Sequence, residues 1–363
     1  MMSTRPRLTF DTYGVCSACQ WMKKKQKIDW AKKEKDLKKI LKKHKRSNKD
    51  FFDCIVPVSG GKDGSYIAYN LKKKYNMNPL CLTINPALQT NIGKKNLENF
   101  VRSGFNLISV SIDYHSLQII NKIGFQQIGF PYYGWLLAIH SAVFRMASMM
   151  NINLIIYAED GEREYGGASQ TVKNPIFSID YQKKIYLEGH TKKIINIAKK
   201  NVNFNPIFFE YPDIPKKKEK EIELIHWSSF DNWDPYKNYL IAKKYCGLIA
   251  SDSSNEGTFT NFAQTDQALV ALHTYCMFLK FGFGRACADA AIEVRRGAMD
   301  RDQALNLVKL YDGQYPQEYL KDYLNYYKMS LKEFDKTLDK FANKNLLNKN
   351  QKTKQWKLKE FIY

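Results

Sequence analysis

Apolar and polar positions follow two alternating patterns over residues 51–160. Four short apolar runs are predicted to form strands, at 51–58, 79–85, 106–113 and 153–160. Three segments between them carry apolar side chains at helical spacing, at 67–75, 94–104 and 131–150. The last of these is apolar on nearly every side, which is typical of a buried helix. Strands that alternate with helices predict an α/β fold, a doubly wound parallel sheet covered on both faces.

The N-terminal region has a different pattern. Residues 1–22 lack a regular period, and residues 23–46 form a lysine-rich helical stretch. In that stretch Trp30, Leu37 and Leu41 recur near helical spacing, so one narrow face can pack against the rest of the protein. The charged remainder is typical of a solvated face, and nucleic-acid binding through it is the less favoured alternative.

The C-terminal half reads as a long connection followed by helices. Residues 165–245 are expected to be irregular. Five helices are expected after them, at 261–281, 285–297, 301–311, 316–328 and 330–342. Ser330 and Glu333 have the spacing of a capping box. The basic tail beyond them is either partly disordered or packs as a short wing. We therefore expect three regions: 1–50, with the basic helix; 51–245, with the sheet; and 246–363, which is helical.

Composition and charge narrow the class of protein. The 363 residues include 57 Lys and Arg against 36 Asp and Glu, a formal net charge of +21. This balance indicates either an anionic partner or simply a lysine-rich composition, and both readings stay open. Seven scattered cysteines do not suggest a disulfide framework, so we expect a reducing, cytoplasmic setting. The sequence shows no secretory leader and no predicted membrane span.

The stretch SGGKDGS, residues 59–65, lies between the first predicted strand and the helix that follows it. Glycines let backbone N–H groups approach an anion closely, and a helix N-terminus adds partial positive charge. Ser59 and Ser65 supply hydroxyl groups and Lys62 supplies charge. Asp63 is unusual beside a phosphate unless it holds Mg²⁺ or orients the loop. The stretch therefore predicts a nucleotide-phosphate site with its metal.

This stretch does not have the Walker spacing. It resembles the pyrophosphate loop, S-G-G-x-D-S, of the ATP pyrophosphatases, except that Gly64 stands where serine is usual and Ser65 follows it. Five more segments occur in an order typical of one family: TRPRLTFDTYGVCSAC, IDW, EDGEREYGG, WDPYKN and FLKFGFGRACADAAIEVRRGAMDRDQAL. Over residues 4–315 the chain resembles the N-acetyl sugar amidotransferases. That family serves bacterial lipopolysaccharide biosynthesis and the flagellin sugars related to pseudaminic and legionaminic acid.

The resemblance implies an adenine-nucleotide hydrolase-like sheet that binds ATP and Mg²⁺ at the carboxyl ends of its strands. It implies nucleotide contacts from Ser59, Gly60, Gly61, Lys62, Asp63, Gly64, Ser65, Thr83, Asn85 and Gly161. It implies catalytic roles for Lys62, Asp63, Glu159 and Asp160, with Asp63 also the expected magnesium ligand. For the last two carboxylates, an ordinary strand-end or helix-cap pair is an equal alternative.

The resemblance also implies substrate contacts from two further segments: Glu164, Tyr165, Lys280, Arg285, Asp289, Glu293 and Arg296. Asp289, Glu293 and Arg296 are spaced to share one helix face, so an intrahelical ion-pair face is the alternative interpretation. In the functional reading, the arginines hold the diphosphate of a sugar nucleotide.

The implied activity is that of an AMP-forming ligase. It converts the acetamido group of an N-acetylated sugar or sugar nucleotide to an acetamidino group, with ammonia and an O-adenylated intermediate. A separate glutaminase, a cyclase-like subunit and a homodimer are the implied partners; nucleic acid and membrane are not expected. Two alternatives remain: a tRNA-modifying enzyme with the same loop, either a thiolase or an amidine-forming ligase, and a basic binding protein without activity.

Cys16 and Cys19 form a Cys-x-x-Cys pair, which is half of the four ligands that a closed structural zinc site needs. The resembled family carries another such pair just upstream. For this sequence three possibilities stay open: the start is truncated, the zinc site is lost, or a distant residue such as Cys246 completes it.

Overall fold

A computed structural model describes residues 2–48, 50–167, 174–350, 352 and 355–360. Its centre is a six-stranded sheet in the order β3-β2-β1-β4-β6-β5. The strands are β1 Cys54–Pro57, β2 Pro79–Ile84, β3 Leu107–Val110, β4 Leu154–Tyr157, β5 Ile176–Phe177 and β6 Glu223–His226. Every pairing is parallel except that of β5 with β6. The predicted α/β fold with a doubly wound sheet is confirmed.

Alternate side chains of the strands enter separate cores on the two faces of the sheet. Ile55 and Ile155 pack with α5 Tyr114–Ile128, α6 Tyr133–Met149 and α9 Thr191–Ala198. Val56 and Ile156 point the other way and pack with helices α2 Trp30–His44, α3 Lys62–Lys73, α4 Asn91–Arg102 and α11 Pro235–Cys246. This period of two is the reason that the buried strands are apolar throughout.

The expectation of an irregular excursion over 165–245 is wrong. The segment contains β5, β6 and several helices, among them α8 Ile179–Tyr181, α9, α10 Lys216–Glu221 and α11. Strand β6 was missed because it has only four residues and both ends, Glu223 and His226, are polar. Its position beside β4 makes it an interior strand of the sheet. Helix α5 was not predicted from the sequence either.

The N-terminal region is more regular than expected. Helix α1 covers Ser17–Lys25, so residues 1–22 are not all irregular. The lysine-rich stretch is two helices instead of one, because the side chain of Asp29 caps the start of α2 and separates it from α1. Leu37 and Leu41 are buried, as the predicted packing face requires.

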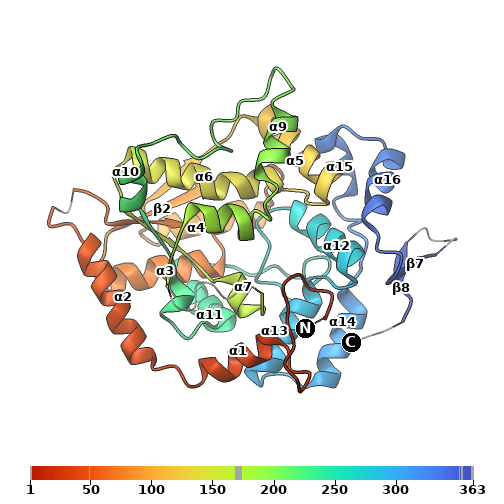
Figure 1. The fold of residues 1–363 in the computed structure, drawn as a ribbon, viewed down its shortest axis with the longest axis horizontal. Helices are drawn as coiled ribbons and strands as arrows, with labels where there is room; N and C mark the ends of the chain where they lie inside the picture. The colour runs from red at the N-terminus through yellow and green to blue at the C-terminus, as the bar shows by residue number, and fades with distance from the viewer. Residues whose placement is uncertain (1, 49, 168–173, 351, 353–354, 361–363) are drawn as a thin grey trace.

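The C-terminal helices pack along one side of the α/β part (Figure 1). They are α12 Leu269–Phe281, α13 Arg285–Arg296, α14 Arg301–Tyr311, α15 Leu320–Tyr327 and α16 Leu331–Phe341. The capping box of Ser330 and Glu333 is present at the start of α16. A hairpin of β7 Leu347–Lys349 and β8 Trp356–Leu358 follows, so the described part of the tail forms a small wing. Among the described residues, no helix combines the length and the apolar character that crossing a membrane requires.

Candidate functional site

Two cavities meet at the carboxyl edge of the sheet, where strand order reverses between β1 and β4. The first, of about 440 Å³, is lined by residues 57–64, and we call it the glycine-loop cavity. The second, of about 390 Å³, is lined by α1, α13 and residues 232–236, and we call it the charged cavity. Both are lined by Lys62, Asp63, Glu159, Phe262, Ala263 and Arg285. A switch point of this kind is where doubly wound sheets bind their ligands.

The loop between β1 and α3 closes tightly against its neighbours. Gly60 has φ +81°, and a β-carbon there would lie 2.8 Å from the backbone nitrogen of Leu97. A β-carbon at Gly64 would lie 2.9 Å from the carbonyl oxygen of Pro57. The resembled motif has serine at the position of Gly64, but here any residue larger than glycine would require the backbone to move. The turn leaves the N-terminus of α3 facing the glycine-loop cavity.

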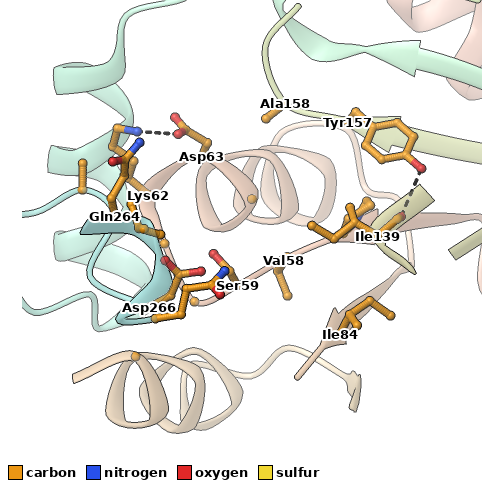
Figure 2. A pocket seen from close by; sticks show the side chains of 18 of the residues that line it. Val58, Ser59, Lys62, Asp63, Ile84, Ile139, Tyr157, Ala158, Gln264 and Asp266 are labelled. Atoms are coloured by element: carbon orange, nitrogen blue, oxygen red, sulfur yellow. Dashed lines mark hydrogen bonds and ion pairs between the residues drawn. The ribbon is translucent and has the colours of Figure 1, made fainter. Parts of the chain in front are cut away.

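Lys62 and Asp63 form an ion pair in which their side chains point toward one another (Figure 2). The amide of Asn238, from α11, donates to the second carboxylate oxygen of Asp63 over 3.0 Å. Burial lowers the pKa of Lys62, but the Asp63 and Glu159 carboxylates outweigh it and leave the pKa raised, so the ammonium form persists. These contacts fix a positive charge at the junction of the two cavities.

Glu159, just beyond β4, is the other carboxylate at this junction. Burial raises its pKa, and the nearby Asp63 raises it further, against the opposing effects of Lys62 and Arg285. Carboxylate oxygens beside the glycine-rich loop are donors of the kind that Mg²⁺ takes together with nucleotide phosphates. The donor set at the junction therefore fits the predicted magnesium ion.

The charged cavity is dense in ion pairs. Its lining includes the basic residues Lys25, Lys62, Arg285, Arg295 and Arg296, and the acidic residues Asp63, Glu159, Glu164, Asp234, Asp289 and Glu293. Arg285 Nε lies 2.8 Å from Oδ1 of Asp289, and the other carboxylate oxygen of Asp289 accepts a hydrogen bond from the Thr258 hydroxyl over 2.8 Å. Burial lowers the pKa of Arg285, but Asp289, Tyr165 and Glu159 together raise it. The guanidinium therefore stays charged at the junction.

Arg296 and Glu293 form an ion pair on one face of α13, as the alternative interpretation of their spacing predicted. The Arg296 guanidinium also lies 5.2 Å from the ring centre of Tyr236 and 3.7 Å from Asp234. Arg296 and Glu293 also line the charged cavity. The ion-pair reading and the substrate reading therefore apply to the same surface.

The N-terminal segment forms a wall of the charged cavity, which the sequence did not predict. Lys25 is buried and donates to Glu164 over 2.9 Å and to the Trp233 carbonyl over 2.7 Å. The Trp21 indole donates to the same Glu164 carboxylate over 3.1 Å. Arg7 binds Glu162 with two hydrogen bonds of 2.7 and 2.8 Å. A buried lysine in a lysine-rich stretch gives no local signal, so this role depends on tertiary contacts.

A second wall that the sequence missed is the segment 262–267, which precedes α12. All six of its residues line the glycine-loop cavity. The Thr90 backbone N–H donates to the Asp266 carbonyl over 3.1 Å, which ties the segment to the chain after β2. Figure 2 shows Asp266 and Ser59 among the residues that line this cavity. Because this segment carries no phosphate motif, its role could not be recognised from the sequence.

Six predicted site residues line neither cavity: Ser65, Thr83, Asn85, Asp160, Gly161 and Lys280. Ser65 and Thr83 are buried in α3 and β2. Asn85 is hydrogen-bonded to Ser109 and Ser111 on the β3 side. Lys280 donates to the Ile128 carbonyl over 3.2 Å.

Asp160 and Gly161 begin the short helix α7 Gly161–Glu164. The Asp160 side chain accepts from Arg163 N–H at its start and from the Tyr186 hydroxyl over 2.8 Å. These contacts match the helix-cap alternative for Asp160. The loop after the cap carries Glu164 and Tyr165 into the charged cavity.

Cys16 and Cys19 were predicted as half of a zinc site that Cys246 could complete. Cys16 precedes α1 and Cys19 lies within it, whereas Cys246 is in the core beneath α3, where it donates to the Ser65 carbonyl over 3.6 Å. No group of three or more His, Cys, Asp or Glu residues suited to a metal ion occurs within the described part of the chain. The described residues therefore do not fit the closed four-ligand zinc site. All seven cysteines are free thiols.

Comparison with known families gives one match, which lies in the C-terminal region. Residues 256–363 match the family described as LPS biosynthesis protein WbpG-like, C-terminal domain. The matched family is one of lipopolysaccharide biosynthesis, and the match supports the resemblance to the N-acetyl sugar amidotransferases. It includes α13, which carries Arg285 and Arg296 into the charged cavity. A comparison with curated proteins found no match.

Proposed function

We propose that this protein is an ATP-dependent, AMP-forming amidotransferase that converts the acetamido group of a sugar or sugar nucleotide to an acetamidino group. The observation that carries the proposal is the junction of the two cavities. A phosphate-type loop opens into one cavity, a polar and aromatic pocket forms the other, and Lys62, Glu159 and Arg285 line both. ATP in the first cavity and the sugar in the second would meet at these charges.

The glycine-loop cavity supports the ATP half of the proposal. The free backbone of residues 59–61 and the N-terminus of α3 are suited to the pyrophosphate end of the nucleotide. Lys62 adds a charge held in place by Asp63. Apolar walls from Leu82, Ile84 and Val143 are suited to the base and ribose, which carry no charge.

The charged cavity supports the sugar half. Its carboxylates and guanidinium groups offer many hydrogen-bonding partners for hydroxyl groups, and Trp21, Trp30 and Tyr236 offer aromatic faces. Most of the basic side chains already have a carboxylate partner, so the pocket does not present an excess of unpaired positive charge to an anion. This balance favours a polar, hydroxyl-rich substrate over a long polyanion such as tRNA.

The chemistry follows from the groups at the junction. The acetamido oxygen attacks the α-phosphorus of ATP, the bond to the β-phosphate oxygen breaks, and pyrophosphate leaves. Lys62 and Arg285 stabilise the charge that develops on the phosphates. Glu159 takes the amide proton in this scheme as the C=N bond of the O-adenylated imidate forms, a role that its raised pKa supports. Ammonia then adds to the imidate carbon, and AMP leaves with the C–O bonding electrons, which gives the amidine.

Magnesium would be held by Asp63 together with the phosphates of ATP, which leaves Glu159 as the base. When bound, it supplies charge neutralisation for the departing pyrophosphate. The chain's own contribution there is the hydrogen bond from Asn238, which orients the Asp63 carboxylate.

We further propose that ammonia comes from a separate glutaminase, with a cyclase-like subunit, in a homodimeric assembly. The cysteines Cys54, Cys81 and Cys276 are buried, and burial raises the pKa of each thiol, which is the opposite of what a glutaminase nucleophile needs. Cytoplasmic residence accords with free thiols in all seven positions.

The test is AMP and pyrophosphate release from ATP, Mg²⁺ and ammonium, with N-acetylated sugars, their nucleotide-linked forms, and tRNA as separate acceptors. AMP formed only with an N-acetyl acceptor, with one oxygen of that acceptor replaced by NH in its mass spectrum, is the expected result. AMP formed only with tRNA would overturn the proposal. So would the absence of ATP binding by a folded protein, which would favour a binding protein without activity.

A further inference from the structure

Gln267 is a fully buried amide that faces the glycine-loop cavity. It is 0 % exposed and belongs to the lining of that cavity. Neither its side-chain oxygen nor its side-chain nitrogen has a hydrogen-bond partner among the described residues. A buried amide without hydrogen-bond partners is destabilising, because both of its polar groups lose their hydrogen bonds to water on folding. Such a group is retained where a ligand completes its hydrogen bonds.

The position of Gln267 is fixed on the β2 side of the cavity. Its backbone forms an antiparallel bridge with Gln89, and the next N–H, of Ala268, donates to the Leu88 carbonyl over 2.9 Å. Both partners belong to the connection that follows β2. The phosphate loop follows β1, the neighbouring strand, and the junction with the charged cavity lies toward β4 on its other side. The connection after β2, which holds Gln267, and the chain after β4, which holds Glu159, therefore flank the loop after β1 on its two sides.

The surroundings of Gln267 suit a flat apolar ring. Ile84, Val270 and Trp135 line the same cavity. The Trp135 indole is held in place because it donates to the Ile84 carbonyl over 2.8 Å. Tyr132 packs edge-on against that indole, with ring centres 5.7 Å apart. One cavity therefore combines a rigid apolar and aromatic wall with an unpaired amide, and these are the two features that a purine base requires of its site.

We propose that Gln267 reads the edge of the adenine ring of ATP, so that the nucleobase site belongs to the WbpG-like C-terminal region and not to the strand end at Thr83 and Asn85. The amide NH₂ donates to a ring nitrogen, and the amide oxygen accepts from the exocyclic amino group. This inference rests on the proposed function, because it takes ATP as the nucleotide of the phosphate loop. It replaces the sequence-based adenosine contacts, whose side chains do not line the cavity.

The test measures the affinity of the full-length protein for ATP and for GTP in Mg²⁺ by calorimetry, without any acceptor. A carboxylate at 267 accepts two hydrogen bonds, which guanine N1–H and its amino group can donate, while the lone pair of adenine N1 is repelled. We expect Gln267→Glu to bind ATP about tenfold more weakly or worse, and to lower the ATP-to-GTP affinity ratio. Gln303→Glu is the matched control, because Gln303 caps the exposed start of α14 and glutamate can fill the same role.

A second variant separates recognition from a purely structural role. Gln267→Met keeps the length of the side chain and removes the unpaired polar atoms, so the nucleotide-free protein should melt at a higher temperature while ATP binding weakens. ATP binding with an unchanged ATP-to-GTP ratio in both folded variants would overturn the inference and leave the proposed function standing. A wild-type protein that binds neither nucleotide would overturn both.

Discussion

The two cavities differ in how the chain builds them. The glycine-loop cavity is organised around one contiguous stretch, residues 57–64, that turns from a strand into a helix. The charged cavity has no such stretch, since α1, the loop after α7, residues 232–236 and α13 each contribute part of its wall. The first depends on backbone geometry and the second on ion pairs between distant side chains. Backbone groups can bind a feature common to every nucleotide, whereas assembled side chains can be matched to one acceptor.

This difference predicts which substitutions lower the rate of AMP formation and which lower the stability of the folded protein. The largest effect is expected for Lys62→Ala, because the charge at the junction is lost while the loop backbone remains. AMP formation should fall about 10²–10³-fold. Lys73→Ala, at the exposed end of the same helix, is the control, and steady-state AMP release measures both. Equal rates for wild-type and Lys62→Ala proteins would remove the junction from the mechanism.

Substitution of Lys25 should act on stability first. Lys25→Met leaves Glu164 partly buried without its ion-pair partner, and the loss of one member of such a pair costs about 3 kcal/mol. Denaturant unfolding measures the change, with the exposed Lys24→Met as the matched control. The double variant Lys25→Met with Glu164→Gln should recover part of the loss. Without any recovery, the Lys25–Glu164 pair would not be what joins α1 to the cavity wall.

Arg285 and Lys280 provide a comparison within one helical block. Arg285→Lys keeps the charge but loses the planar contact with Asp289, so kcat/KM should fall about tenfold with little change in melting temperature. Lys280→Arg should change kcat/KM less than twofold by the same reasoning, because Lys280 lines neither cavity. Similar losses in both variants would mean that the acceptor extends beyond the charged cavity.

The smallest expected effect concerns Asp266. Burial raises the pKa of its carboxyl group to about 6, above the ordinary 3.8. The protonated form is therefore favoured in the folded state, so its contribution to stability is present below about pH 4 and is lost as the pH rises through about 6. Asp266→Asn should raise the melting temperature at pH 8 by about 2 °C, and the gain should disappear near pH 4.

The exposed Asp302→Asn serves as the control for Asp266→Asn, since it should show no such dependence on pH. Differential scanning calorimetry at both pH values measures the change. A gain of equal size at pH 4 and pH 8 would show that the carboxyl group does not titrate in this range in the folded protein.

What the sequence determined by itself is local. The order of apolar strands and helices from 51 to 160 is enough to predict a doubly wound sheet, because strand burial on both faces leaves continuous apolar runs. The glycine-rich loop could be singled out because its glycines, lysine and aspartate are neighbours in the chain. The capping box of α16 is also a short-range feature.

What only the tertiary structure decided is which distant residues share a surface. Lys25 and Gln267 have ordinary neighbours in the sequence, and their roles appear only when α1 packs on the loop after α7 and when residues 265–268 bond to the chain after β2. Asp160, Lys280 and Thr83 had suggestive positions in the chain, but the fold turns them to a helix cap, a backbone carbonyl and the core. Periodicity reports which side chains are buried, whereas long-range packing selects which of them meet.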